Sequence, residues 1–120
     1  MAGAAAPCEI TQDVIDAAGA VRDDALLQYT QKLIHDPRDK ADVSLAYAGS
    51  PAFFKMWQIE SAMKQVVAGT NYFIKVRISD SEHIRLRIYQ SLPHAGGKCQ
   101  LSGMLWGEQA SKEVAYFEPT

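Results

Sequence analysis

Hydrophobic residues in the first third of the chain recur at the spacing of an amphipathic helix. Thr11 is placed to act as the N-cap, and Asp13 suits the positive end of the helix dipole. Pro37 ends the run, because the residue before a proline is pushed out of the helical region. The pattern therefore predicts a helix over residues 11–35. Its apolar stripe consists of Val14, Ala17, Ala18, Val21, Ala25, Tyr29 and Leu33.

From Phe53 onward the hydrophobic period changes to two, which is typical of strands with one buried and one wetter face. We expect strands over residues 53–64, 70–79, 83–90 and 98–106, and a weaker strand or an extended tail over 114–117. The buried face is expected to hold Tyr72, Ile74, Val76, Ile78, Ile84, Leu86 and Ile88. One helix followed by antiparallel strands predicts an α+β fold, in which the helix packs on the sheet.

Strict alternation also assigns the flanking strands their faces. In the first strand it places Phe53, Trp57, Ile59 and Met63 on one side. In the last strand it places Trp106 on the face opposite Leu101 and Leu105. Polar residues at 79–82 predict a turn, and the proline and glycines of 91–97 predict a loop.

Two segments are less regular. Residues 1–10 are expected to form a flexible arm, because they are terminal and contain Gly3 and Pro7. Residues 36–50 fit either a short helix that starts at Asp36 or an exposed loop, and the pattern does not separate the two.

Charge and composition narrow the function classes. The 120 residues suffice for one domain, and the formal net charge of −2 gives no attraction to nucleic acid or to an anionic membrane. Lys75, Arg77, Arg85 and Arg87 are interpreted as a solvated outward face of the sheet. No apolar run approaches the ~20 residues of a membrane span, and the first residues do not resemble a signal peptide, so we expect a cytoplasmic protein.

No group of residues indicates catalysis or metal binding. Cys8 and Cys99 are far apart in sequence and are expected to be free thiols. His35, His83 and His94 lack the close spacing of a zinc site. We therefore expect no catalytic residue, no cofactor and no metal ion, and hence no enzyme.

The most specific signal is the segment 65–73, which reads QVVAG followed by TNYF. It resembles the signature loop of the cystatins. Ile74–Arg77, Tyr89–His94 and the closing Tyr116–Phe117 are similar to the stefin branch of that family. The resemblance covers residues 53–117 and, more loosely, residues 9–34.

The resemblance implies a cystatin fold, with one long helix gripped by a curved antiparallel sheet, as a single domain over residues 1–120. It also implies a reversible, tight-binding, non-covalent inhibitor of papain-like cysteine proteases, such as cathepsins B, L, H and S or their parasite and host equivalents. The arm and two hairpin loops of such proteins enter the active-site cleft. The protease-binding residues implied here are Gly3, Gln65, Val66, Val67, Ala68, Gly69, Leu92, Pro93 and His94.

Strand connectivity agrees with this expectation. A strand enters the 65–69 loop, another leaves it, and the next returns, so the 91–97 loop should lie at the same end of the sheet. Val66, Val67, Ala68 and Leu92 offer small apolar surface and no side chain that transfers a proton. This end of the molecule is therefore predicted to act as a plug.

Two departures from the stefin pattern favour an alternative, a non-inhibitory cystatin-fold module that binds another protein. The arm is short and Gly3 is its only candidate glycine, so we expect an affinity that is weaker or more uneven across proteases. An insertion over residues 34–51 lengthens the link from the helix to the first predicted strand. We expect a monomer, with a domain-swapped dimer as the alternative oligomeric state.

Overall fold

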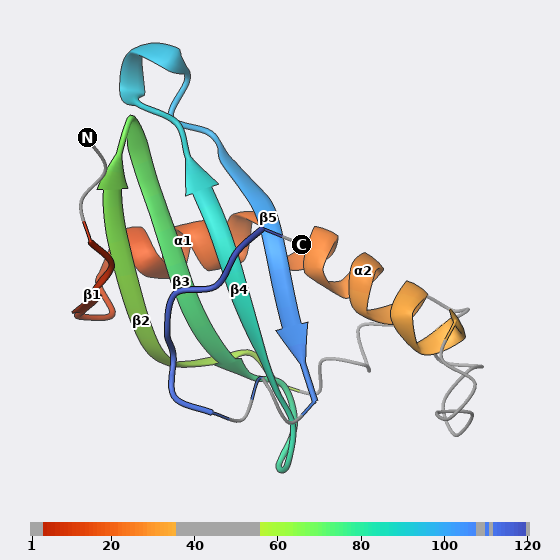
Figure 1. Cartoon of the computed structure of the whole chain (residues 1–120). Coiled ribbons are helices and arrows are strands. Elements are labelled where there is room, and N and C mark those ends of the chain that lie inside the picture. The colour runs from red at the N-terminus through yellow and green to blue at the C-terminus, as the bar shows by residue number, and fades with distance from the viewer. Residues whose placement is uncertain (1–3, 36–55, 108–109, 111, 120) are drawn as a thin grey trace.

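The computed structural model describes residues 4–35, 56–107, 110 and 112–119. Within these ranges the chain forms an α+β fold, as predicted (Figure 1). The helices are α1 (Gln12–Ala20) and α2 (Arg22–His35), with a short 3₁₀ turn η2 (Pro93–Ala95). The strands are β1 (Ala6–Cys8), β2 (Gln58–Val67), β3 (Gly69–Arg77), β4 (His83–Gln90) and β5 (Cys99–Trp106).

The single helix predicted over residues 11–35 is in fact two helices that meet at Val21. This residue leaves helical geometry, with φ of −106° and ψ of 6°, and its N–H donates to the Gly19 carbonyl. Gly19 and the β-branched Val21 both lower helix propensity at this point. Val21 is nevertheless fully buried. The break therefore turns the helix axis without interrupting the apolar stripe.

The five described strands form one antiparallel sheet in the order β1-β2-β3-β4-β5. Helix α1 crosses one face and contacts β3, β4 and β5, while α2 continues past the β5 edge (Figure 1). The predicted buried face of β3 and β4 is confirmed, because its residues pack with the helix stripe. This core comprises Val14, Ala17, Ala18, Val21, Ala25, Tyr29, Ala62, Tyr72, Ile74, Val76, Ile78, Ile84, Leu86, Ile88 and Met104.

The opposite face of the sheet is covered, so its interpretation as a solvated surface is wrong. Residues 112–119 run across this face as an extended tail without strand pairing (Figure 1). Beneath the tail Phe73 is fully buried, and Arg85 and Arg87 are only 6% and 9% exposed. The prediction failed because alternation counts arginine as polar, although a guanidinium has flat faces that stack on aromatic rings.

The tail is held by contacts with both arginines. Arg87 Nη1 donates to the Phe117 carbonyl at 2.7 Å, and Arg85 Nη2 donates to the Ala115 carbonyl at 3.1 Å. The Arg87 guanidinium lies 5.4 Å from the Phe73 ring centre and 5.2 Å from that of Tyr116. The Phe73 and Tyr116 ring centres are 5.3 Å apart. The tail thus closes a second, smaller hydrophobic layer.

Two β-bulges change the faces assigned to the flanking strands. In β2 the register shifts between Ile59 and Ser61, so Ile59 pairs with Val76 in the core while Met63 pairs with Phe73 on the tail face. The single face predicted for Ile59 and Met63 is therefore wrong.

A second register shift lies between Arg87 and Ile88 of β4, opposite β5. Ser102 is the extra residue on β5, and its hydroxyl donates to the Arg87 carbonyl at 3.1 Å. Leu101 and Trp106 consequently both pack against the core. The opposite faces predicted for this pair are wrong, because one inserted residue reverses the alternation.

Part of the arm expected to be flexible is a strand. Ala6–Cys8 pair antiparallel with residues 62–64 of β2, because the edge of β2 offers unpaired backbone groups. Phe53, residues 36–51 of the predicted insertion, and the two alternatives for 36–50 lie outside the described residues. Among the described residues, no helix combines the length and apolar character needed to cross a membrane.

Candidate functional site

Two loops lie at the same end of the sheet, as the strand connectivity predicts. We call the β2–β3 turn, residues 65–69, the first tip, and residues 91–97 between β4 and β5 the second loop. Thr70 at the start of β3 pairs with Gln90 at the end of β4, which places the loops next to each other. Figure 1 shows both at the end of the sheet where β2 and β4 finish.

The first tip is a tight hairpin turn around Ala68. Val67 pairs with Gly69 across the turn. Below it, the buried Asn71 donates its side-chain N–H to Gln65 Oε1 at 3.1 Å. Gln65 and Asn71 thus bond to each other and shape the base of the turn. At the turn itself Val66 is 61% exposed and Ala68 is also exposed.

Gly69 has a conformation and a packing environment that only glycine fits. Its φ is +116°, which side chains rarely adopt. A Cβ atom there would also lie 2.8 Å from the Tyr89 hydroxyl and would overlap the Gln90 carbonyl. The Tyr89 hydroxyl donates to the Ala68 carbonyl. The turn backbone is therefore pressed directly against the end of β4.

The second loop is closed by its own hydrogen bonds. Ser91 and Lys98 are joined at its base, where Ser91 N–H donates to the Lys98 carbonyl and Lys98 N–H donates to Ser91 Oγ, both at 3.0 Å. Gly97 N–H donates to the Leu92 carbonyl at 3.0 Å. The loop projects Leu92, which is 37% exposed, together with the exposed Pro93 and His94.

The arm approaches the same end of the molecule. Because β1 runs antiparallel to β2, with Ala6 opposite Lys64, the residues before Ala6 lead towards the first tip. Ala4 and Ala5 are the last described residues in that direction. Gly3, the arm residue assigned to protease binding, lies outside the described residues. The other eight assigned residues all lie in the first tip or the second loop.

The combined surface of these loops is apolar at its most exposed points. Val66, Ala68, Leu92 and Pro93 carry no charge and no group that transfers a proton. Such a surface suits shape-complementary insertion into a cleft rather than bond-making chemistry. His94 is the titratable side chain among the assigned residues.

Both cysteines are free thiols, Cys8 at the end of β1 and Cys99 at the start of β5 just after the second loop. Burial raises the pKa of both thiols, and Lys64 partly offsets this effect at Cys8, while Asp16 adds to it at Cys99. Both thiols are therefore protonated and weakly nucleophilic at neutral pH. Over the described ranges, no three His, Cys, Asp or Glu side chains group as metal ligands would.

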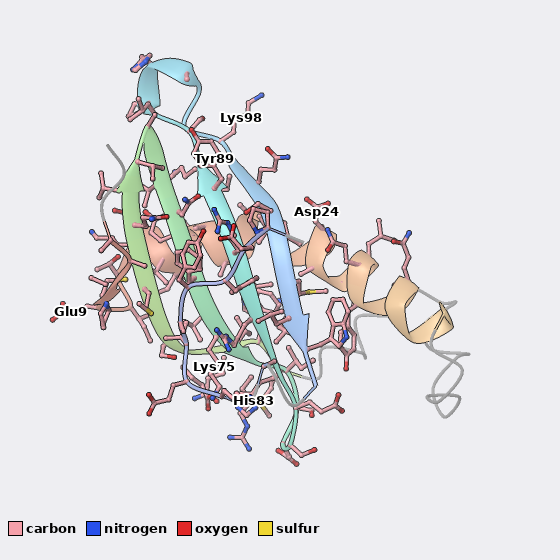
Figure 2. All side chains as sticks on the ribbon, in the orientation of Figure 1. Glu9, Asp24, Lys75, His83, Tyr89 and Lys98 are labelled. Carbon is pink, nitrogen blue, oxygen red and sulfur yellow. The ribbon has the colours of Figure 1, made fainter. Side chains whose placement is uncertain are left out.

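Sequence reasoning missed Tyr89 and Gln90. Gln90 Nε2 donates to the Gly97 carbonyl at 3.1 Å, and Gln90 Oε1 accepts a hydrogen bond from the Tyr72 hydroxyl at 3.4 Å. Figure 2 shows Tyr89 below the second loop, far from His83 at the other end of β4. The segment 89–94 was part of the resemblance, but nothing in its pattern indicates that these side chains hold backbone carbonyls.

Comparison with known proteins gives consistent matches. The family described as Cystatin domain matches residues 48–104. Cystatin-B of Oplegnathus fasciatus is 45% identical over 53 residues, which cover 44% of this chain and 53% of that protein. Cystatin-B of Pan troglodytes and of Homo sapiens are 44% and 42% identical over 64 residues, or 53% of this chain and 65% of each relative. The chain thus matches between half and two thirds of the length of these relatives.

The matched region begins after the helices and contains both loops of the candidate site. The antiparallel sheet, the helices packed on one of its faces and this match support the predicted α+β cystatin fold. The chain is similar to the cystatin family over residues 48–104, and the relatives that it matches are Cystatin-B proteins.

Proposed function

We propose that this protein is a reversible, tight-binding, non-covalent inhibitor of papain-like cysteine proteases of the cathepsin type. The first tip and the second loop enter the active-site cleft side by side, and the arm adds contacts through Gly3. The observation that carries this proposal is the pair of exposed apolar loops at one end of a cystatin fold.

The energetics of the site support this mode of binding. Both loops are fixed by hydrogen bonds before any partner arrives, so little conformational entropy remains to be lost on binding. Val66 and Leu92 provide apolar area that a narrow cleft would remove from water. Without a nucleophile or acid–base pair at the tip, binding leaves the catalytic cysteine of the protease chemically unchanged.

The remaining partner assignments belong to the same proposal. The protein acts as a monomer in the cytoplasm and uses no cofactor. A net charge of −2 and apolar tips give it no affinity for nucleic acid or for a membrane surface.

The test is a titration of papain and of cathepsins B and L with the purified monomer, followed by hydrolysis of a fluorogenic peptide. Replacing Val67 and Ala68 together by aspartate should raise the inhibition constant by at least about 100-fold, because the charges would be buried without partners. Leu27→Asp is the matched control. Leu27 is 56% exposed and lies on α2, away from the tips, so this variant should inhibit like the parent protein.

The alternative function is that of a non-inhibitory cystatin-fold module that binds another protein. The same titration distinguishes this module from a protease inhibitor. A folded, monomeric protein that inhibits none of these proteases at micromolar concentration would exclude the proposed function. The fold would be unaffected by that result. Equal inhibition by the double aspartate variant would instead exclude the first tip as the binding element.

A further inference from the structure

Two consecutive residues at the end of β4 each hold one of the loops. Successive side chains of a strand point to opposite faces, so Tyr89 lies on the tail face and Gln90 on the helix face. Tyr89 donates through its hydroxyl to the Ala68 carbonyl in the first tip. Gln90 donates through Nε2 to the Gly97 carbonyl in the second loop. One dipeptide thus bonds to the backbone of both loops.

The side chains of Tyr89 and Gln90 pack closely against their neighbours. Gly69 is buried, and any Cβ at this position would meet the Tyr89 ring at 2.9 Å as well as its hydroxyl. On the other face the Tyr72 hydroxyl donates to Gln90 Oε1, which orients the amide so that its N–H group points to Gly97. Gln90 is therefore held by hydrogen bonds at both ends of its amide, and Tyr89 packs against the turn whose Ala68 carbonyl it bonds.

We propose that Tyr89 and Gln90 are positioning residues that set the first tip and the second loop relative to each other. The inference rests on the proposed function, because the geometry matters for a partner that must accept both loops at once. Tyr89 acts through Ala68 and Gln90 acts through Gly97, while the exposed surface at the tips is supplied by their neighbours. If either hydrogen bond is lost, its loop samples conformations that do not fit the same cleft.

The two bonds can be removed almost without changing shape. Tyr89→Phe deletes only the hydroxyl. Gln90→Glu keeps the oxygen that accepts from Tyr72 but loses the N–H donor to Gly97. Tyr116→Phe is the matched control, because it deletes a tyrosine hydroxyl that lies in the tail and donates to the exposed Glu118 carboxylate.

The first measurement uses the free protein and needs no protease. Backbone ¹⁵N relaxation should show order parameters falling from about 0.85 towards 0.6 at Ala68 and Gly69 in Tyr89→Phe, and at Gly96 and Gly97 in Gln90→Glu. The order parameters of core amides, such as that of Leu86, should be unchanged in both variants. In Tyr116→Phe the order parameters of all amides should be unchanged. Unchanged order at both loops would overturn the positioning role, whatever the protein inhibits.

The second measurement is the rate at which the papain complex dissociates. A net hydrogen bond contributes about 0.5–1.5 kcal/mol, so each variant should dissociate about 2- to 12-fold faster while the association rate stays within about 2-fold. Loops that loosen without faster dissociation would overturn the role in binding. Absence of inhibition by the parent protein would reject the proposed function, and the relaxation measurement would still decide whether the two residues order the loops.

Discussion

Gly69 shows at the scale of one residue how the tip depends on the absence of a side chain. Gly69→Ala would force a φ of +116° on alanine and press its methyl group against Tyr89. We expect the free energy of unfolding to fall by about 1–3 kcal/mol, since strained backbone of this kind costs that much. Inhibition of papain should weaken at least about 10-fold, because the backbone of the turn must shift.

Gly19→Ala provides the control for that measurement. Gly19 lies within α1, and apart from its chain neighbours and the helix's own backbone no described atom is within 4 Å of the place where its Cβ would be. Alanine should therefore stabilise the helix by about 0.5–1 kcal/mol and leave inhibition unchanged. Urea unfolding combined with papain titration checks both variants. An intact inhibition constant in Gly69→Ala would show that the observed turn is not the binding conformation.

A site residue can be predicted from the sequence when the motif itself contains it. The QVVAG motif and the Leu-Pro-His segment locate the exposed tips, because the motif is itself the surface that projects. The bond from Tyr89 to Ala68 arises only when three strands are in register. A tyrosine at a strand end has no sequence feature that distinguishes it from an ordinary solvent-exposed aromatic residue.

At the scale of elements, the faces of the regular strands were predicted correctly, and those of the bulged strands β2 and β5 were not. Alternation from Tyr72 to Ile88 predicts β3, β4 and their buried face correctly, because no bulge lies between these two central strands. The bulges of β2 and β5 each add one residue, Glu60 and Ser102. Glu60 Oε1 lies 2.8 Å from His83 Nε2, a contact with a strand two positions away that local periodicity cannot include.

The contribution of the tail, residues 112–119, to the free energy of unfolding can be measured. The Phe117 ring centre lies 6.0 Å from the Phe73 ring centre. The Arg85 guanidinium lies 5.6 Å from the Phe117 ring centre. Phe117→Ala should lower the free energy of unfolding by about 1–3 kcal/mol, because it uncovers Phe73 and removes the ring on which Arg85 stacks. The midpoint of guanidinium unfolding measures this loss.

Glu113→Ala is the corresponding control, since Glu113 is an exposed tail residue whose replacement should change stability by less than about 0.5 kcal/mol. Protease inhibition should be the same in both tail variants, because the tail covers the sheet face and not the loops. An unchanged midpoint in Phe117→Ala would mean that the tail contributes nothing to stability from its place on the sheet.

At the scale of the whole molecule, the two loops proposed to bind proteases lie at the end of the sheet opposite Met56. The chain re-enters the described structure at Met56, whose N–H donates to the Ile78 carbonyl at 3.1 Å. This contact lies where β2 begins and β3 has just ended. The 10 residues of β2 then extend to the first tip, a distance of about 33 Å.

Replacing residues 36–50 by a short turn should therefore leave the inhibition constants within about 2-fold of those of the parent protein. Circular dichroism and the unfolding midpoint of the shortened protein establish that it is folded. A folded variant with strongly altered inhibition would show that the segment reaches the protease or the tips. In that case the interaction-module alternative would gain support.

The two tryptophans lie at one end of the molecule, so tryptophan fluorescence reports on that end. Trp57 immediately precedes β2 and lies 5.3 Å from the Arg22 guanidinium, and Trp106 pairs with Ile84 at the start of β4. Both indoles report on the packing of helix and sheet at the end remote from the tips. A change in tryptophan fluorescence when a ligand binds the tips would therefore show that binding alters the structure at the far end of the sheet.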